Sequence, residues 1–195
     1  MANGNTWHHL KQLISADYKR HLSMRGAIWS VSFHVVFWFR ICTWLYGKNK
    51  FTRILGSPFH QWYKFLNLIS GIQLPICTKI DGGLKFFHYN CIVLAQGVNI
   101  GKNCSIHQGV TIGRVFNGPQ SGVPTIGNNV VIFAGAKILG GVKLADNVIV
   151  GANAVVVKDV DADCVVAGIP AKVISTDSSK CFDETWAHYF ARDDE

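Results

Sequence analysis

The chain of 195 residues is 49% hydrophobic and only 16% charged, with 19 glycines. This composition suits one or two compact domains with a substantial core, and it excludes a disordered, collagen-like or coiled-coil chain. The formal net charge of +7 is unevenly distributed. Residues 1–70 contain nine Lys or Arg and one acid, Asp17, a charge of +8, whereas residues 71–195 contain ten basic and eleven acidic residues, a charge of −1. Because five of the six tryptophans also precede residue 71, we expect two differently built segments that meet near residue 70.

The segment from Ala27 to Tyr46, AIWSVSFHVVFWFRICTWLY, has about the length of a membrane-spanning helix. It contains His34 and Arg40, however, and an arginine at the bilayer centre costs roughly 2.5 kcal/mol or more. Spanning is therefore disfavoured. Two interpretations remain open: a buried helix in an oligomer interface, and peripheral contact of residues 1–70 with the inner face of a membrane through their Trp and basic side chains.

The six cysteines, at positions 42, 77, 91, 104, 164 and 181, form no CxxC motif and show no close metal-ligand spacing. The chain starts with the polar sequence MANGNTWHHLKQL, which does not resemble a cleavable signal peptide. We therefore expect reduced thiols and a cytoplasmic protein.

From Leu94 to Asp161 the chain divides into six-residue units, which open with an aliphatic residue and have a small or aliphatic residue in fifth place. An α-helix cannot keep this period, because six residues leave equivalent side chains about 120° apart. Short strands joined by tight turns, three to a coil, keep every first place pointing inward. The repeat therefore predicts a parallel β-helix. The first places are Leu94, Ile100, Ile106, Ile112, Ile126, Ile132, Ile138, Leu144, Val150 and Val156, and the fifth places are Val98, Cys104, Val110, Val130, Ala136, Val142, Val148, Ala154 and Val160.

The repeat is interrupted at two places, and we expect a functional site there because the faces of a solenoid are otherwise regular. Between Ile112 and Ile126 the chain is eight residues longer than one unit, which predicts a loop, RVFNGPQSGVPT. The second irregularity is KFFHYNCIV, residues 85–93, which contains His88. Elsewhere, Gly and Asn in the second to fourth places supply turns that tolerate positive φ.

At these motifs the chain resembles the hexapeptide-repeat acyltransferases, specifically the serine acetyltransferase branch and its sugar- and polysaccharide-modifying relatives. The resemblance rests on HYNCIVLAQGVNIG, on IHQGVTIG with its loop, on VIFAGAKILGGVKLADNVIVGANAVVVKDV and on VVAGIPAKVI. It implies a mainly β fold, with an α-helical region (1–70), a left-handed parallel β-helix (71–174) and a short tail (175–195). Within the tail, the sequence FDETWAHYFAR predicts a short helix. It also implies acetyl-CoA bound between neighbouring coils, and a homotrimer or a dimer of trimers.

The resemblance assigns to His88 the role of general base, which takes the proton from an acceptor hydroxyl as the hydroxyl attacks the acetyl thioester. Imidazole suits this role because it titrates near neutral pH, and direct transfer needs no covalent enzyme intermediate. Backbone N–H groups are sufficient to stabilise the oxyanion that forms.

Other candidate site residues follow from the same resemblance. His107 is expected at a coil corner near the loop, where it assists acceptor binding or orients the base, and Gln108 lines the same wall. Lys172 is expected near the phosphates of CoA. An ordinary polar histidine at the surface is an equally good interpretation of His107, and an ordinary solvated lysine is as good for Lys172. A further set has small side chains, which core packing explains almost as well. The small residues expected along the pantetheine arm are Ala134, Gly135 and Ala152.

The chain departs from the serine acetyltransferase pattern at the positions expected to hold free serine. Phe87 and Gln73 stand where that branch has acids, and Gly122 and Val123 stand where it has an Arg-His pair. Without these groups the charges of serine lack fixed partners, which is costly if they are desolvated. We therefore expect an acetyl-CoA-dependent O-acetyltransferase that acts on a hydroxyl of a sugar, a surface polysaccharide or its precursor. Serine O-acetylation in cysteine biosynthesis is the alternative.

Two further classes of function receive little support. A three-histidine zinc site is hard to assemble, because only His88 and His107 lie in the repeat region, so no metal is expected. A non-catalytic scaffold or a nucleic-acid binder would use the basic end of the chain, but the net charge of −1 on residues 71–195 argues against a nucleic-acid partner.

Overall fold

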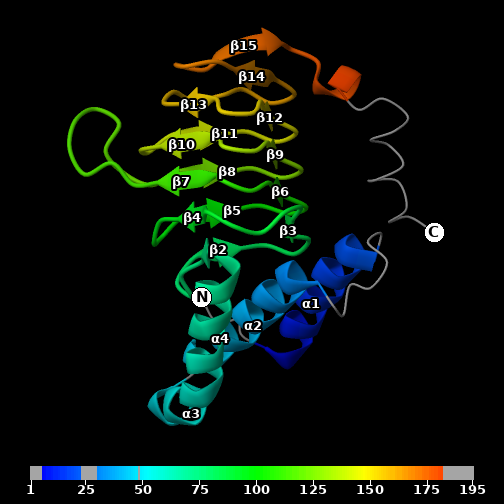
Figure 1. The fold of residues 1–195 in the computed structure, drawn as a ribbon, viewed down its shortest axis with the longest axis vertical. Helices are drawn as coiled ribbons and strands as arrows, with labels where there is room; N and C mark the ends of the chain where they lie inside the picture. The colour runs from blue at the N-terminus through cyan, green and yellow to red at the C-terminus, as the bar shows by residue number, and fades with distance from the viewer. Residues whose placement is uncertain (1–5, 23–29, 48, 182–195) are drawn as a thin grey trace.

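A computed structural model of the chain describes residues 6–22, 30–47 and 49–181. Helices come first and lie at one end of a column of short strands (Figure 1). A 3-10 helix over Ser178–Cys181 ends the described part, so the short helix predicted in the tail lies outside it. The helices are α1 (Trp7–Leu22), α2 (Val31–Tyr46), α3 (Lys50–Leu55) and α4 (Ser57–Ser70).

The strands form three sheets that wind around a common core, and successive strands along the chain lie in different sheets. Sheet A contains β1 (Ile72–Gln73), β4 (Ile92–Leu94), β7 (Thr111–Gly113), β10 (Lys137–Leu139) and β13 (Val155–Val156). Sheet B contains β2 (Lys79–Ile80), β5 (Asn99–Ile100), β8 (Thr125–Ile126) and β11 (Lys143–Leu144). Sheet C contains β3 (Lys85–Phe86), β6 (Ser105–Ile106), β9 (Val131–Ile132), β12 (Ile149–Val150), β14 (Val165–Ala167) and β15 (Lys172–Ser175). The strands pair in parallel, except that β15 runs antiparallel to β14. The predicted left-handed parallel β-helix is confirmed.

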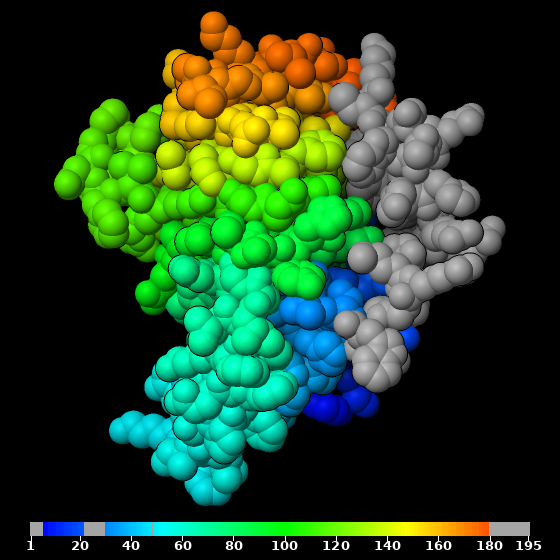
Figure 2. All heavy atoms as spheres, viewed as in Figure 1, coloured from blue at the N-terminus to red at the C-terminus, as the bar shows by residue number. Residues whose placement is uncertain are grey.

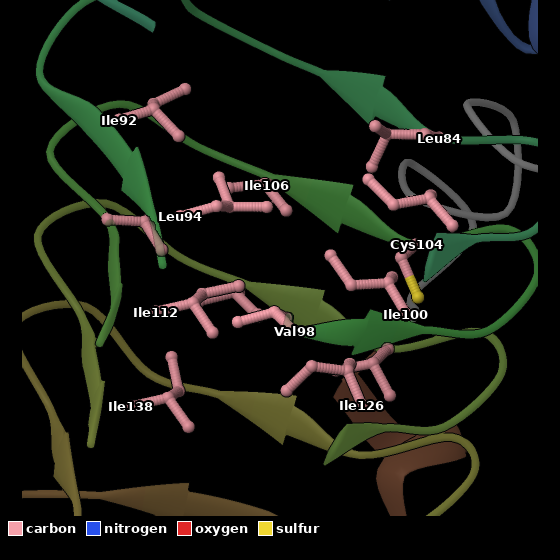
Figure 3. Close-up of a cluster of buried hydrophobic side chains, with 14 of the residues drawn as sticks. Leu84, Ile92, Leu94, Val98, Ile100, Cys104, Ile106, Ile112, Ile126 and Ile138 are labelled. Carbon is pink, nitrogen blue, oxygen red and sulfur yellow. The ribbon is translucent and has the colours of Figure 1, made fainter. Parts of the chain in front are cut away.

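The core of the β-helix consists of the side chains that the six-residue period placed inward. Every first and fifth place named above is at most 7% exposed, as predicted. Figure 3 shows Ile106, Ile112 and Ile138 among the side chains that fill the space between the sheets. Burying one such side chain contributes about 1.5–3 kcal/mol, so the stack is stabilised by many equivalent contacts. Cys104 lies in this core, and burial raises the pKa of its thiol to about 12, which confirms its role as a small buried side chain.

The β-helix starts one coil before Leu94, where the predicted repeat begins. In this first coil Ile72, Ile80 and Phe86 lie in the core, in register with Ile92, Ile100 and Ile106 of the next coil. Within this coil Leu74, Ile80 and Phe86 also follow the six-residue spacing and are buried, and the period is interrupted only by the two extra residues between Phe86 and Leu94.

Asparagines stack at the corner between sheets B and C and stabilise its tight turns. Asn103, Asn129 and Asn147 have φ values of 57°, 56° and 60°, which confirms the predicted use of Asn at positive φ. Their side chains form a continuous hydrogen-bonded ladder: Asn103 donates to Asn129, Asn129 to Asn147, and Asn147 to Asp163. Each turn therefore helps to hold the next one.

A buried ion pair joins the helices to the first coil. Arg40 of α2 donates to both carboxylate oxygens of Asp17 of α1, at 2.8 and 3.1 Å, and the two side chains are 3% and 1% exposed. Arg40 also donates to the backbone carbonyl of Asp81, while Asp17 accepts from the backbone N–H groups of Gly83 and Leu84. The arginine that disfavoured a membrane span is therefore part of the contact between helices and β-helix.

The segment considered above as a membrane helix forms α2 from Val31 onward, and residues 27–29 lie outside the described part. Helix α2 packs against α1, α4 and β3. Within the described ranges, no helix is both long enough and apolar enough to cross a membrane.

Candidate active site

Most of the predicted site residues gather at the corner where each coil turns from sheet C to sheet A, here called the C–A corner. His88 follows β3, and His107 follows β6 one coil further along. Backbone hydrogen bonds stack the turns: Gly109 donates to Asn90, Gly135 to Gln108, and Asn153 to Ala134. The structure therefore brings residues from four coils into one column. In coil order the predicted site residues in it are His88, His107 and Gln108, Ala134 and Gly135, and Ala152.

His88 lies in an enlarged turn of this corner. Eight residues separate the inward side chains of Phe86 and Leu94, whereas six separate Ile106 from Ile112 in the coil above. The extra chain is accommodated by positive φ values at Asn90 and Cys91, 114° and 52°. As a result His88 is exposed at the surface of the corner and accessible to a reactant.

His107 lies beside His88 but in a different environment. Its ring is stacked on Phe87, with centroids 4.7 Å apart and planes 3° apart, and it contacts Phe133 on the other side, with centroids 5.0 Å apart. Burial and, to a smaller extent, the neighbouring His88 together lower the pKa of His107 to about 4, so the ring is neutral near pH 7. The ring centroids of the two histidines are 6.2 Å apart. One histidine is thus exposed and the other is a buried, uncharged side chain.

This aromatic stack is not among the features predicted from the sequence, where Phe87 stands only as the replacement of an acid and Phe133 has no assigned role. The sequence does contain a pattern that predicts the stack. Phe87, His107 and Phe133 each directly follow the inward residue of a sheet C strand. Residues in the same place of consecutive coils lie about 4.8 Å apart, which is a suitable distance for stacked rings. Lys85 adds to the stack, with its Nζ 4.6 Å from the centroid of the Phe87 ring.

The small residues lie further along the same corner. Ala134 is half-buried and Ala152 is exposed, so neither fills a gap in the core. Gly135 has a φ of +75°, and a Cβ there would lie 2.1 Å from Oδ1 of Asn153. The backbone therefore requires glycine at position 135 whether or not a ligand passes over it.

Lys172 lies at the far end of the column. Strand β15 folds back on β14 and places Lys172 opposite Ala167, with its side chain exposed. Four strand spacings separate the coil of His88 from the strand of Ala167, which corresponds to roughly 19 Å. An extended ligand is needed to contact both ends.

The inserted loop leaves a different corner, the one between sheets A and B. Its base is closed by two backbone hydrogen bonds between Val115 and Gly122, and Arg114 donates to the backbone of Gln96. The expectation that His107 lies near the loop is therefore wrong. The reason is that the loop begins after β7, one strand beyond the corner that holds His107. Within one copy of the chain, the two interruptions of the repeat do not meet.

The residues that depart from the expected pattern are likewise distributed over the molecule. Gln73 is exposed on β1 in sheet A, Phe87 is in the aromatic stack, and Gly122 and Val123 belong to the loop. Among the residues that the structure describes, no three His, Cys, Asp or Glu side chains are placed to hold a metal ion.

Comparison with known proteins relates the chain to acyl-transferring enzymes. A family model described as bacterial transferase hexapeptide (six repeats) matches residues 124–158. Serine acetyltransferase of Synechococcus elongatus is 37% identical over 139 residues, which are 69% of this chain and 53% of that protein. Serine acetyltransferase of Staphylococcus aureus is 35% identical over 153 residues, which are 77% of this chain and 70% of that protein. A solved structure of serine acetyltransferase from Brucella abortus in complex with coenzyme A has a TM-score of 0.70 and 29% identity, covering 89% of this chain and 69% of that chain.

A β-helix of hexapeptide repeats with an exposed histidine in an enlarged corner defines the class of hexapeptide-repeat acyltransferases. Within that class the chain belongs to the serine acetyltransferase family, since the staphylococcal relative is matched over more than two thirds of both chains. The chain spans about half the length of the cyanobacterial relative.

This relationship corrects the acceptor predicted from the sequence. We expected the acceptor to be a sugar or polysaccharide hydroxyl and the protein to be most similar to polysaccharide-modifying enzymes. The relatives are instead serine acetyltransferases. The prediction was wrong because it relied on the absence of charged groups at four positions. These positions lie on different elements, and the loss of a charged group does not by itself create a binding site for another acceptor.

Proposed function

We propose that the protein is an acetyl-CoA-dependent serine O-acetyltransferase in which His88 is the general base. The observation that carries the proposal is the position of His88, exposed in the enlarged turn at the start of a column that ends at Lys172. The relationship to serine acetyltransferases supports serine as the acceptor.

In the proposed reaction His88 accepts the proton of the serine hydroxyl while the hydroxyl oxygen attacks the thioester carbonyl. The new C–O bond gives a tetrahedral oxyanion, which collapses by breaking the C–S bond. The products are O-acetylserine and the thiolate of CoA, and the thiolate takes the proton back from His88. Backbone N–H groups of the corner are the donors available to the oxyanion.

The C–A corner suits an extended thioester. The small side chains of Ala134 and Ala152 leave its surface open, and Lys172 supplies a point charge for phosphate at the far end. Acetyl-CoA laid along this column brings its thioester toward His88 and its phosphates toward Lys172.

For the acceptor, we infer that serine binds weakly. Gln108 is exposed in the coil next to His88 and offers an amide that both donates and accepts hydrogen bonds, and His107 adds an uncharged wall. Neither residue neutralises the carboxylate or the ammonium group of serine, so we expect a high KM for serine rather than a low kcat.

We further infer that the protein assembles as a homotrimer through the sides of its β-helix. The loop at the A–B corner and His88 at the C–A corner do not meet in one copy, and side-by-side packing of β-helices brings the loop of one copy to the C–A corner of another. In this arrangement residues 71–174 form the catalytic domain, residues 1–70 an accessory helical domain and residues 175–195 a tail.

The test is the release of free thiol from acetyl-CoA by the purified protein, with and without L-serine. We expect release that depends on L-serine, saturates at high concentration and is lost in His88→Ala. L-Alanine, which lacks the hydroxyl, is the matched control and should give no release. A protein that binds acetyl-CoA but releases no thiol with L-serine at any concentration contradicts the proposal.

A further inference from the structure

Helices α3 and α4 expose large apolar side chains at the helical end of the molecule. On α3, Phe51 and Ile54 are 68% and 73% exposed. On α4, Trp62, Phe65, Leu68 and Ile69 are 47%, 48%, 79% and 56% exposed. These six side chains are here called the α3–α4 face. A soluble surface scatters such residues singly, so their concentration on two short helices indicates a contact site.

The face is held in place by the rest of the fold. The adjoining side of α4 is buried through Tyr63 and Leu66, and the Tyr63 hydroxyl donates to the backbone carbonyl of Leu74. Trp62, Phe65 and Ile69 are three, then four residues apart, so they lie on one side of the helix. Figure 2 shows α3 and α4 projecting as one end of the molecule, away from the last coils of the β-helix. The apolar side chains are thus presented outward from a firmly packed helix.

The charge around this face has one sign. Residues 49–70 contain Lys50, Arg53 and Lys64, all exposed, and no acid. The single acid of residues 1–70, Asp17, is buried and paired with Arg40. The surface of the described helices therefore offers positive charge without a compensating carboxylate.

We propose that the α3–α4 face docks on an anionic lipid bilayer. Exposed Trp and Phe flanked by Lys and Arg match the apolar boundary and the negative headgroups of such a surface. Self-association is the weaker candidate for this face, because it would bring two sets of Lys50, Arg53 and Lys64 together without an acid between them. The face lies within residues 1–70 but on α3 and α4, and the aromatic helix α2 instead packs against α1, α4 and β3.

Co-sedimentation of the full-length protein with vesicles tests the proposal. The probes are vesicles of phosphatidylcholine mixed with phosphatidylglycerol, and vesicles of phosphatidylcholine alone. We expect binding to the mixed vesicles that weakens as salt is raised, and little binding to the neutral vesicles. Lys50→Gln/Arg53→Gln/Lys64→Gln should weaken binding by about a hundredfold, since each base contributes about tenfold or less near an anionic surface. Trp62→Ser/Phe65→Ser should weaken it by about tenfold or more.

Matched control variants keep this test decisive. Phe116→Ser removes an exposed aromatic from the β-helix loop, and Lys158→Gln removes an exposed base from the β-helix, so neither should alter vesicle binding. Thermal melting of each variant establishes that it is folded. Two results overturn the proposal: equal binding to both vesicle types by all variants, or no vesicle binding together with a concentration-dependent mass that Trp62→Ser/Phe65→Ser reduces. The second result assigns the face to contact between copies of the chain.

Discussion

At the level of single residues, the two histidines of the C–A corner have opposite surroundings and therefore different uses. His88 is exposed in the enlarged turn, where a hydroxyl can reach it, whereas His107 is 8% exposed between two phenylalanine rings. A general base must exchange its proton with a reactant, so exposure favours His88. A stacked neutral ring instead contributes packing and an uncharged wall.

Replacing His88 by alanine should lower kcat/KM about 10²–10⁴-fold, the contribution expected of a general base. Because the side chain is exposed, folding and acetyl-CoA affinity should be unchanged. Steady-state kinetics and equilibrium binding of acetyl-CoA measure both quantities. His8→Ala, which removes an exposed histidine from α1, is the matched control and should retain full activity. Near-normal turnover by His88→Ala would exclude this residue as the base.

Protonation of His107 should make stability depend on pH. Its folded-state pKa of about 4 lies below its ordinary value of 6.5, so between these values the unfolded chain binds a proton that the folded chain does not. Stability from this residue is therefore complete above about pH 6.5 and falls as the pH is lowered, by at most about 1.4 kcal/mol per pH unit. Urea unfolding at about pH 7 and about pH 5 measures the loss.

His107→Phe keeps an aromatic ring in the stack and removes the titrating group, so it should lose less stability than the wild type between these pH values. Burial also lowers the pKa of His21, so both proteins retain some acid sensitivity. An identical pH dependence in the two proteins would contradict this role of His107.

At the level of elements, the ion pair between α1 and α2 attaches the helices to the first coil. The charges compensate each other inside the protein, and Asp17 in addition accepts two backbone hydrogen bonds from the coil. Among the described residues that bond to Arg40, only Asp17 does so through a carboxylate. The other acceptors of Arg40 are the backbone carbonyls of Ile80 and Asp81. Asp17 therefore keeps backbone donors if Arg40 is removed, whereas Arg40 loses its counter-ion if Asp17 is removed.

Asp17→Asn should destabilise the protein by about 3–5 kcal/mol, because it leaves a buried guanidinium without its counter-ion. Arg40→Met should cost less, since the carboxylate keeps the N–H groups of Gly83 and Leu84. The double variant Asp17→Asn/Arg40→Met should be more stable than Asp17→Asn alone, because no unpaired charge remains. Urea titration of the three variants measures these differences. Additive losses in the double variant would show that the pair does not act as a unit.

At the level of the whole molecule, the proposed site is divided between corners that one copy does not bring together. Replacing Phe116–Ser121 with Asn-Gly should shorten the loop to a two-residue hairpin, because Val115 and Gly122 already pair at its base. This variant should fold and assemble but lose activity, since the loop of one copy is needed beside His88 of another.

Co-expression of this loop variant with His88→Ala is the sharper measurement. Each variant alone should be inactive, and random mixed trimers should regain activity in about one quarter of their sites, where an intact His88 meets an intact loop. Light scattering should give the mass of a trimer for both variants. Full activity of the loop variant by itself, or no recovery on mixing, would contradict a shared site.

The six-residue period by itself determined the β-helix, because only inward-pointing first and fifth places explain its apolar residues, and these places are buried. It also located the two irregular segments, since an interruption of a strict period is visible in the sequence. The first coil is not part of the predicted repeat although Leu74, Ile80 and Phe86 keep the same spacing, because the two extra residues before Leu94 shift the register and a polar residue, Thr78, occupies a fifth place.

Only the tertiary structure decided which residues meet. Stacking of coils places Phe87, His107 and Phe133 in contact although the repeat and the loop separate them along the chain, and helix packing pairs Asp17 with Arg40. Likewise, the excess positive charge of residues 1–70 could be counted from the sequence, but its arrangement around an exposed apolar face could not. Local period determines which way a side chain points, whereas long-range packing determines what it touches.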